Sequence, residues 1–509
     1  MTQTSRCSLR ISAAVALTAT LALLPAGVKG QQARTDQWSS VRDTIRAVMA
    51  RTDVPSVSVA VARGGRIVWE EAFGWADREK MLRATPNTMY SLASISKPFT
   101  ATALMTLVER GKLDLDHPAN EYLGIGKLTG LAGDASGATV RRVMSHTAGL
   151  PLHYRFYYAD ESYPVLSMDE AIARYGVLVT APGAVYEYSN LGYGIIDHII
   201  ERVSGVDYAD YMRTNVFAPL GLTHTSVGIG PGLEAFVAQR YDGKQRPIAF
   251  YDFDHRGGSA VYASAHDLVR FGMFHLKDHL ADQRPVVKDE TLDLMHQAVA
   301  PANYGLGWIL VEREGQRIVY HTGGMPGVQT ILALYPAEDV AVVVLTNTVA
   351  DVGRISREIE RVTLPRYAEV RRRADAEARQ KAQAASAKAF VPPAELLGEW
   401  SGTLRTWERT IPMTLTVQPD GDVHVRLETG LEALVNGARW DDDNLTGRFA
   451  GTIPTSDASR WPHYVELSLR LRQGTLSGMA SAVTTSERVY FALSSYVSLT
   501  RKAAAAKPN

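Results

Sequence analysis

The sequence predicts a mixed α/β (α+β) protein, in which an antiparallel sheet is flanked by helices, with an all-helical subdomain and a C-terminal antiparallel β-barrel. Strand-like runs near the start, and again between residues 307 and 346, enclose a mainly helical middle at about 110–300. This order is typical of an antiparallel sheet whose faces are covered by helices. Beyond Pro393, short alternating segments separated by turn signals indicate an up-and-down barrel. A chain of 509 residues also suggests two or three domains.

Individual elements of this fold follow from local patterns. Val41, Ile45 and Val48 share one face of an expected helix, and Gly64-Gly65 separates two strand-like runs as a hairpin turn does. The expected elements before the barrel are a helix at Trp38–Ala50, a hairpin at Ser56–Ala62 and Arg66–Glu71, a second hairpin at Gly307–Arg313 and Gln316–Tyr320, and strands at Gln329–Tyr335 and Val340–Thr346.

Residues 1–30 have the pattern of an export signal. Arg6 and Arg10 precede an uncharged apolar run, residues 11–24, which is short for a transmembrane helix. We therefore expect an exported protein, periplasmic or secreted from a bacterium, with no stable membrane span after cleavage; an uncleaved anchor is the alternative. The one cysteine, Cys7, would leave with the signal, so the mature chain would have no thiol nucleophile.

Composition excludes few functions but narrows the partners. The hydrophobic fraction of 46% is that of an ordinary globular protein, and the formal net charge of zero does not favour nucleic acid or an anionic membrane. The one basic run, Ala368–Lys388, is interrupted by acidic residues and contains no aromatic residue, so we interpret it as a solvated helical linker that ends at Pro392-Pro393. The expected partner is a small molecule or short peptide, with no nucleic acid.

The first candidate for chemistry is Ser94-Ile95-Ser96-Lys97, just before a helical run that stops at Gly111. A serine at a helix start lies near unpaired backbone N–H groups, which favour negative charge. A lysine three residues later lies one turn along the same face, where it can take the proton of a nucleophile. These four residues alone match by chance in many chains, and taken alone they favour an ordinary surface helix start over a catalytic site.

The second candidate is the turn-rich loop Gly183–Gly194, which leads into an expected helix from Ile195. Tyr188 and Asn190 are two apart, so in an extended loop their side chains project the same way. A lysine ammonium nearby would loosen the tyrosine proton, because positive charge favours phenolate. An asparagine donates and accepts hydrogen bonds, which suits a substrate amide. A tyrosine that merely caps the loop is the alternative.

The third candidate is His321-Thr322-Gly323-Gly324, at the expected end of the strand through Tyr320. Paired glycines at a strand edge let a substrate backbone approach closely and leave backbone N–H groups free. A simple turn before the next strand explains the same residues.

Together, in this order and spacing, the three candidates resemble the serine penicillin-recognising enzymes, in the branch of class C β-lactamases, D,D-carboxypeptidases, D-aminopeptidases and related esterases. Further stretches resemble the same family: Met144–Pro151, Pro219–Leu222, Tyr304–Trp308 and Leu345–Asn347. The resemblance implies a β-lactamase/transpeptidase-like serine hydrolase domain at 36–365. The charged linker would then be 366–393, and the barrel at 394–503 looks like the lipocalin-like domains appended to some family peptidases.

The resemblance also implies a role for each candidate residue. Ser94 would be the acylated nucleophile, Lys97 would lower the cost of removing its proton, and Tyr188 would carry a proton to the leaving group. Asn190 would hold the substrate amide, and the backbone N–H groups of Ser94 and Gly324 would form the oxyanion hole. The pocket for the substrate would be lined by His321, Thr322, Gly323 and Gly324. The resemblance implies neither a metal nor a cofactor.

One position departs from the family pattern. Class C β-lactamases usually carry lysine where this chain has His321, and histidine is mostly neutral near pH 7. Efficient hydrolysis of β-lactams is therefore in doubt, whereas peptidase and esterase members tolerate histidine.

We therefore expect a serine hydrolase that cleaves an amide or ester through a Ser94 acyl-enzyme, first a peptidase for D-amino-acid or cell-wall-type peptides. The alternatives are a carboxylesterase, a weak class C-like β-lactamase, a non-catalytic penicillin-binding-like module, and a metallohydrolase built on His275 and His279. The choice of substrate and the oligomeric state are left open by the sequence.

Overall fold

Both ends of the first domain contribute strands to one seven-stranded antiparallel sheet, ordered β11-β12-β13-β14-β1-β2-β3. The computed structural model describes residues 36–313, 315–386, 390–486 and 489–502; the expected export signal and Cys7 lie outside these residues. The late strand β14 pairs with β1, with Val59 opposite Val344. The bounds are β1 (Ser56–Arg63), β2 (Ile67–Asp77), β3 (Leu82–Arg83), β11 (Ile309–Arg313), β12 (Gln316–Met325), β13 (Val328–Tyr335) and β14 (Val340–Thr346).

Both expected hairpins are confirmed, but the expected end of one strand was wrong. We expected the strand through Tyr320 to end at His321–Gly324. Instead β12 continues to Met325, because its ladder with β13 runs on to Met325 opposite Val328. The paired glycines therefore lie inside a strand and not in a turn.

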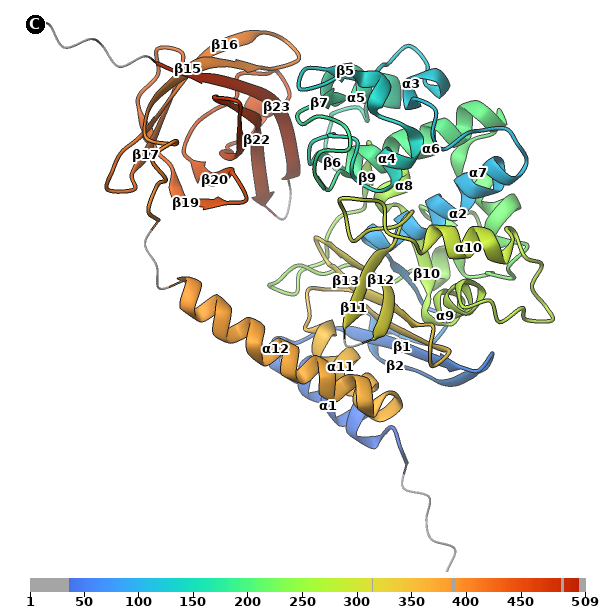
Figure 1. The fold of residues 1–509 in the computed structure, drawn as a ribbon. Helices are drawn as coiled ribbons and strands as arrows, with labels where there is room; N and C mark the ends of the chain where they lie inside the picture. The colour runs from blue at the N-terminus through green and yellow to red at the C-terminus, as the bar shows by residue number, and fades with distance from the viewer. Residues whose placement is uncertain (1–35, 314, 387–389, 487–488, 503–509) are drawn as a thin grey trace, which may run out of the picture. The chain divides into compact units, whose positions relative to one another are not determined.

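Helices cover both faces of the sheet (Figure 1). Val57, Val59 and Val61 of β1 belong to the core beneath α1 (Ser39–Thr52) and α11 (Val352–Thr363). Ala60 and Ala62 point to the opposite face, which is covered by α9 (Ala265–His275) and the rest of the helical region. The alternation along β1 thus places one buried core on each side of the sheet.

The middle of the chain is less helical than expected. Its long central helix, α2 (Ser96–Glu109), is buried on nearly all sides. Around it lie short helices, loops and small strands. The glycine, proline and aspartate residues of this region end many of its helical segments within a few turns. The remaining elements are α3 (Ala119–Tyr122), α4 (Val140–Met144), α5 (Met168–Tyr175), α6 (Asn190–Ser204), α7 (Tyr208–Met212), α8 (Arg256–Ser259), α10 (Asp289–Met295), β4 (Met89–Ser91), β5 (Thr129–Gly130), β6 (Tyr154–Tyr158), β7 (Val177–Leu178), β8 (Thr225–Val227), β9 (Tyr251–Phe253) and β10 (Val261–Ser264).

The expected C-terminal barrel is present as a nearly closed antiparallel sheet. Its first strand pairs with its last, with Trp400 opposite Arg501, and Met413, Leu415 and Val417 turn inward as their alternation predicts. The strands are β15 (Gly398–Arg405), β16 (Thr410–Val417), β17 (Val423–Leu427), β18 (Ala433–Leu434), β19 (Asn436–Asp441), β20 (Asn444–Phe449), β21 (Tyr464–Arg472), β22 (Thr475–Ser486) and β23 (Val489–Arg501).

The barrel is joined to the helical region by backbone and side-chain contacts. Strand β23 pairs with β6, with Phe491 opposite Arg155. The fully buried carboxylate of Asp457 accepts a hydrogen bond from the Tyr175 hydroxyl and lies 3.8 Å from Arg174. A buried carboxylate needs such partners, so this contact orders both sides of the junction.

The charged linker is one helix, α12 (Pro365–Ser386), but its first turns are not solvated. Tyr367 is buried in the core beneath α11, and the guanidinium of Arg371 donates to the carboxylate of Glu360, which is 1% exposed. The start of the helix is therefore anchored to the first domain. Among the described residues, no helix combines the length and the apolar composition that a membrane crossing needs.

Candidate active site

Ser94 is the middle residue of a short 3-10 turn, Ala93–Ile95, that runs directly into α2. Ala93 and Ile95 are buried on either side of it, while Ser94 keeps partial exposure. Ala93 adopts a left-handed conformation, with φ of 50°. A non-glycine residue in that region is strained, and such strain is found where a neighbouring side chain must be held in place.

Lys97 lies fully buried in the first turn of α2 and has three polar neighbours. Its Nζ is 3.0 Å from Ser94 Oγ, 2.9 Å from Asn190 Oδ1 and 3.0 Å from the carbonyl oxygen of Gly258. Burial lowers the pKa of the ammonium well below its usual value. Deprotonation of this amine leaves two N–H donors, enough for Asn190 and Gly258, and a lone pair that accepts the Ser94 proton.

Tyr188 also contacts Ser94. Its hydroxyl donates to Ser94 Oγ at 3.0 Å, and its ring centroid lies 4.9 Å from Lys97 Nζ. The sequence-based expectation that Lys97 would loosen this proton was wrong, because burial raises the pKa of Tyr188. Desolvation is the main cause and outweighs the hydrogen bond to Ser94, which lowers this pKa, while burial also drives Lys97 toward its uncharged form. Tyr188 is therefore a proton donor in this structure.

Asn190 is the first residue of α6, so this helix starts five residues earlier than expected. Ser189 caps it, its hydroxyl accepting the N–H of Gly192, and this cap replaces the turn that Gly192 and Gly194 suggested. The side-chain oxygen of Asn190, Oδ1, accepts a hydrogen bond from Lys97 Nζ. Contact with a substrate amide stays a prediction for this residue.

The strand β12 crosses over the turn that carries Ser94. A Cβ added to Gly323 would lie 2.1 Å from the carbonyl oxygen of Leu92, so glycine alone permits this approach. Gly324 faces open space, and Thr322 is exposed on the same side of the strand. The alternation of β12 therefore presses Gly323 against the turn and leaves Thr322 and Gly324 accessible.

His321 is held by hydrogen bonds at both ring nitrogens, and its role in lining a substrate pocket stays a prediction. It is 2% exposed, its Nε2 accepts from the Tyr304 hydroxyl at 3.0 Å, and its Nδ1–H donates to the carbonyl oxygen of Thr322 at 2.7 Å. Burial, with a smaller effect of Lys97, lowers its pKa to about 3. The imidazole is neutral with both nitrogens occupied, so it offers no charge to a substrate carboxylate.

Two residues near the site were given no role by the sequence. Gly258 supplies the carbonyl that holds Lys97, and the Gly257-Gly258 pair was its only signal. His146 accepts the N–H of Ser189 through Nδ1 at 3.1 Å, and its ring centroid is 4.3 Å from that of Tyr188. Its own carbonyl accepts the N–H of Glu187 at 2.8 Å. His146 thus binds the backbone on both sides of Tyr188.

The histidine pair considered for a metal does not share a helix face. Helix α9 ends at His275, whose Nδ1 lies 3.2 Å from Nε2 of His296 inside the core. His279 follows in a loop and lies 3.1 Å from Asp289. The two rings therefore have separate surroundings.

Comparison with known proteins places this chain in a family. The profile of the Beta-lactamase family matches residues 41–363, so the chain belongs to this family of serine hydrolases. This chain is 28% identical to penicillin-binding protein 4* of Bacillus subtilis over 329 residues. The alignment covers 58% of this chain and 68% of that protein. The unguisins hydrolase ungD' of Aspergillus campestris is 26% identical, with 60% and 61% covered. The match therefore spans less than two thirds of the fungal relative.

Solved structures support the fold. The octameric penicillin-binding protein homologue from Pyrococcus abyssi superposes with a TM-score of 0.55 at 21% identity and covers 89% of this chain and 99% of its own. A class C beta-lactamase gives a TM-score of 0.55 at 20% identity, with 64% and 95% covered. At this identity the likeness concerns the fold alone.

The contact between β12 and the Ser94 turn predicts opposite outcomes for two adjacent glycines. Gly323→Ala should destabilise the fold by about 1–3 kcal/mol, because the new methyl group must displace the backbone of Leu92. Gly324→Ala is the matched control and should change stability far less, because its Cβ meets open space. Urea unfolding measures both, and equal losses would contradict the close packing described.

Proposed function

We propose that this protein is an exported serine hydrolase that cleaves an amide or ester through an acyl-enzyme on Ser94. The carrying observation is that Ser94 Oγ lies 3.0 Å from both Lys97 Nζ and the Tyr188 hydroxyl. A nucleophile needs a proton acceptor on one side and the leaving group needs a proton donor on the other. Membership of the Beta-lactamase family supports this chemistry, and the pattern of residues 1–30 supports export.

In the proposed acylation step, the neutral Lys97 amine takes the Ser94 proton as Oγ attacks the carbonyl carbon. Backbone N–H groups of Ser94 and Gly324 hold the oxyanion, a type of contact whose loss costs about 2.7–4 kcal/mol in related chemistry. Tyr188 gives its proton to the leaving nitrogen or oxygen and regains one from the Lys97 ammonium. Water then attacks the ester carbonyl, and its proton returns by the same residues to Ser94.

The neutral state of His321 bears on the substrate. A β-lactam carries a carboxylate that a fixed cation would bind, and burial keeps the imidazole uncharged, with a pKa of about 3. This favours substrates without a carboxylate at that position, first D-amino acid amides and related peptides. Esters are the second candidate on the same ground, and β-lactams the third.

Removing the nucleophile tests the proposal. Ser94→Ala should lower turnover of D-amino acid amides, p-nitrophenyl esters and nitrocefin by at least about 10³-fold, with an unchanged melting curve. Intact mass should show a fluorophosphonate adduct on the native protein and none on the variant. Retained turnover in the variant would overturn the mechanism. An adduct without turnover of any of the three substrates would favour a non-catalytic penicillin-binding-like module.

The burial of Lys97 predicts the pH dependence. Because its pKa is lowered, the amine is already neutral at pH values where a free lysine is charged. The ratio kcat/KM should therefore fall as pH is lowered through the depressed pKa and stay level above it. Lys97→Arg should lose activity across the range, since a guanidinium stays protonated. A profile that rises only near the ordinary lysine pKa would contradict a neutral base.

The contacts of His146 predict that it positions Tyr188. His146→Ala should lower kcat by about tenfold to a hundredfold with little change in KM, because Tyr188 then loses its backbone anchor. His146→Asn is the matched control, since its side-chain oxygen stands near the position of Nδ1 and can accept the Ser189 N–H. Rescue by asparagine supports positioning, and equal loss of activity in both variants would contradict it.

A further inference from the structure

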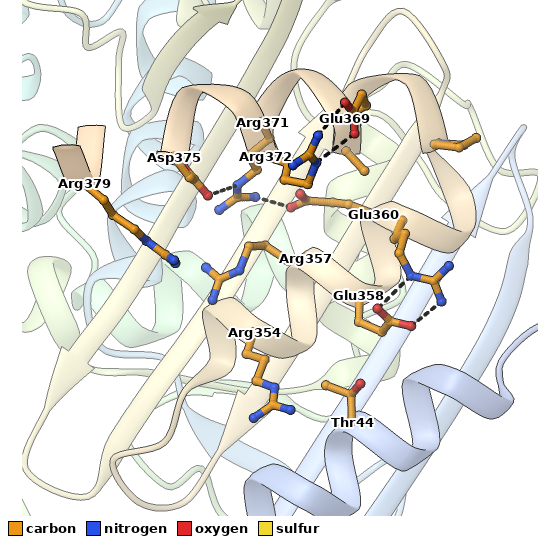
Figure 2. A pocket seen from close by; sticks show the side chains of 13 residues that line it. Thr44, Arg354, Arg357, Glu358, Glu360, Glu369, Arg371, Arg372, Asp375 and Arg379 are labelled. Atoms are coloured by element: carbon orange, nitrogen blue, oxygen red, sulfur yellow. Dashed lines mark hydrogen bonds and ion pairs between the residues drawn. The ribbon is translucent and has the colours of Figure 1, made fainter. Parts of the chain in front are cut away.

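A hollow of about 490 Å³ lies between α1, α11 and α12 (Figure 2). None of the candidate active-site residues lines it. Its lining is dominated by charge, with arginines outnumbering carboxylates. The arginines are Arg354, Arg357, Arg361, Arg371, Arg372 and Arg379, and the carboxylates are Glu358, Glu360, Glu369 and Asp375. Sites for small molecules have volumes in this range but are mostly apolar, so the charge is what needs explaining.

The carboxylates of this hollow are already engaged. Glu358 binds Arg361 at 2.6 Å, and Glu369 binds Arg372 at 2.8 Å. Glu360 is buried and accepts from Arg371, while Asp375 stands 3.9 Å from Arg371 and also 3.8 Å from Arg313 of β11. Each carboxylate in the lining thus has an arginine partner, and none of these partners is Arg354, Arg357 or Arg379.

The other three arginines, Arg354, Arg357 and Arg379, have little to balance them. Arg357 has one carboxylate near it, Asp351 at 3.8 Å, and Asp351 is shared with Arg51 at 3.7 Å. Among the described residues, neither Arg354 nor Arg379 has a carboxylate within 4 Å.

The three arginines line one hollow together with Thr44 of α1. In Figure 2, Arg357 of α11 and Arg379 of α12 extend toward each other, and Arg354 of α11 extends on the side of Thr44. The spacing of Arg354 and Arg357 along α11 places them on one helix face. Two helices therefore bring three cations to the wall of one hollow, with a hydroxyl group beside them.

We propose that this hollow binds a phosphate-type oxyanion, either a free phosphate compound or the headgroup of an anionic phospholipid. Guanidinium groups bind such oxyanions through paired N–H donors, and each converging cation adds to the attraction. The Arg371–Glu360 pair links α12 to α11, whereas the Arg361–Glu358 and Arg372–Glu369 pairs each lie within one helix. In the part of the chain that the structure describes, Arg354, Arg357 and Arg379 have no such close partner and can turn to the ligand. This site is independent of the proposed hydrolysis.

Calorimetric titration of the whole protein with inorganic phosphate and with pyrophosphate, at ionic strength matched with sodium chloride, tests the proposal. The triple variant Arg354→Gln, Arg357→Gln, Arg379→Gln should bind at least tenfold more weakly than the native protein. A control with the same loss of charge on α12, outside the lining, is Arg366→Gln, Arg373→Gln, Lys381→Gln, which should bind within twofold of native. Melting curves establish that both variants fold.

Cosedimentation with vesicles separates the two sources of phosphate. Vesicles of phosphatidylcholine with phosphatidylglycerol are compared with vesicles of phosphatidylcholine alone, using the same three proteins. Binding to the anionic vesicles that is lost in the first variant and kept in the control supports a headgroup site, and saturable phosphate or pyrophosphate binding with that pattern supports a soluble ligand. Absence of both, or equal binding by the two variants, would overturn the proposal.

Discussion

The candidate site depends above all on the burial of one amine. Lys97 is fully enclosed, and its Nζ has three polar neighbours drawn from three separate parts of the chain: Ser94, Asn190 and Gly258. A charged ammonium is costly in such a place, so its pKa falls and the amine becomes a base. The same desolvation raises the pKa of Tyr188, so one physical cause acts on both groups that lie 3.0 Å from Ser94 Oγ.

Close backbone packing is the second constraint. The turn that carries Ser94 is held beneath β12 because Gly323 has no side chain to keep the strand away from Leu92. The loop that carries Tyr188 is held by His146 through its ring nitrogen and its carbonyl. Function in this region therefore rests on residues that do not themselves carry the chemistry.

In the barrel and in α12, the sequence likewise predicted the element but not the segment against which it packs. The alternation of Met413, Leu415 and Val417 predicted a barrel strand, yet nothing in it indicated that β23 would pair with β6. The charged run after Pro365 predicted a helix, but its first turns pack through Tyr367 on the first domain. A periodic pattern reports which face is buried and not which segment buries it.

The sequence alone determined the strand and helix periodicities, the two hairpins, the barrel and the three candidate motifs, because these depend on residues near one another in the chain. Ser94, Lys97 and Tyr188 belong to short motifs, and these motifs indicated a site only when they were taken together. Tertiary structure decided the direction in which the pKa values of Lys97, Tyr188 and His321 shift, and the continuation of β12 through Gly323. These depend on burial and on contacts between segments far apart in sequence, and burial reversed the direction that the lysine charge had suggested for Tyr188.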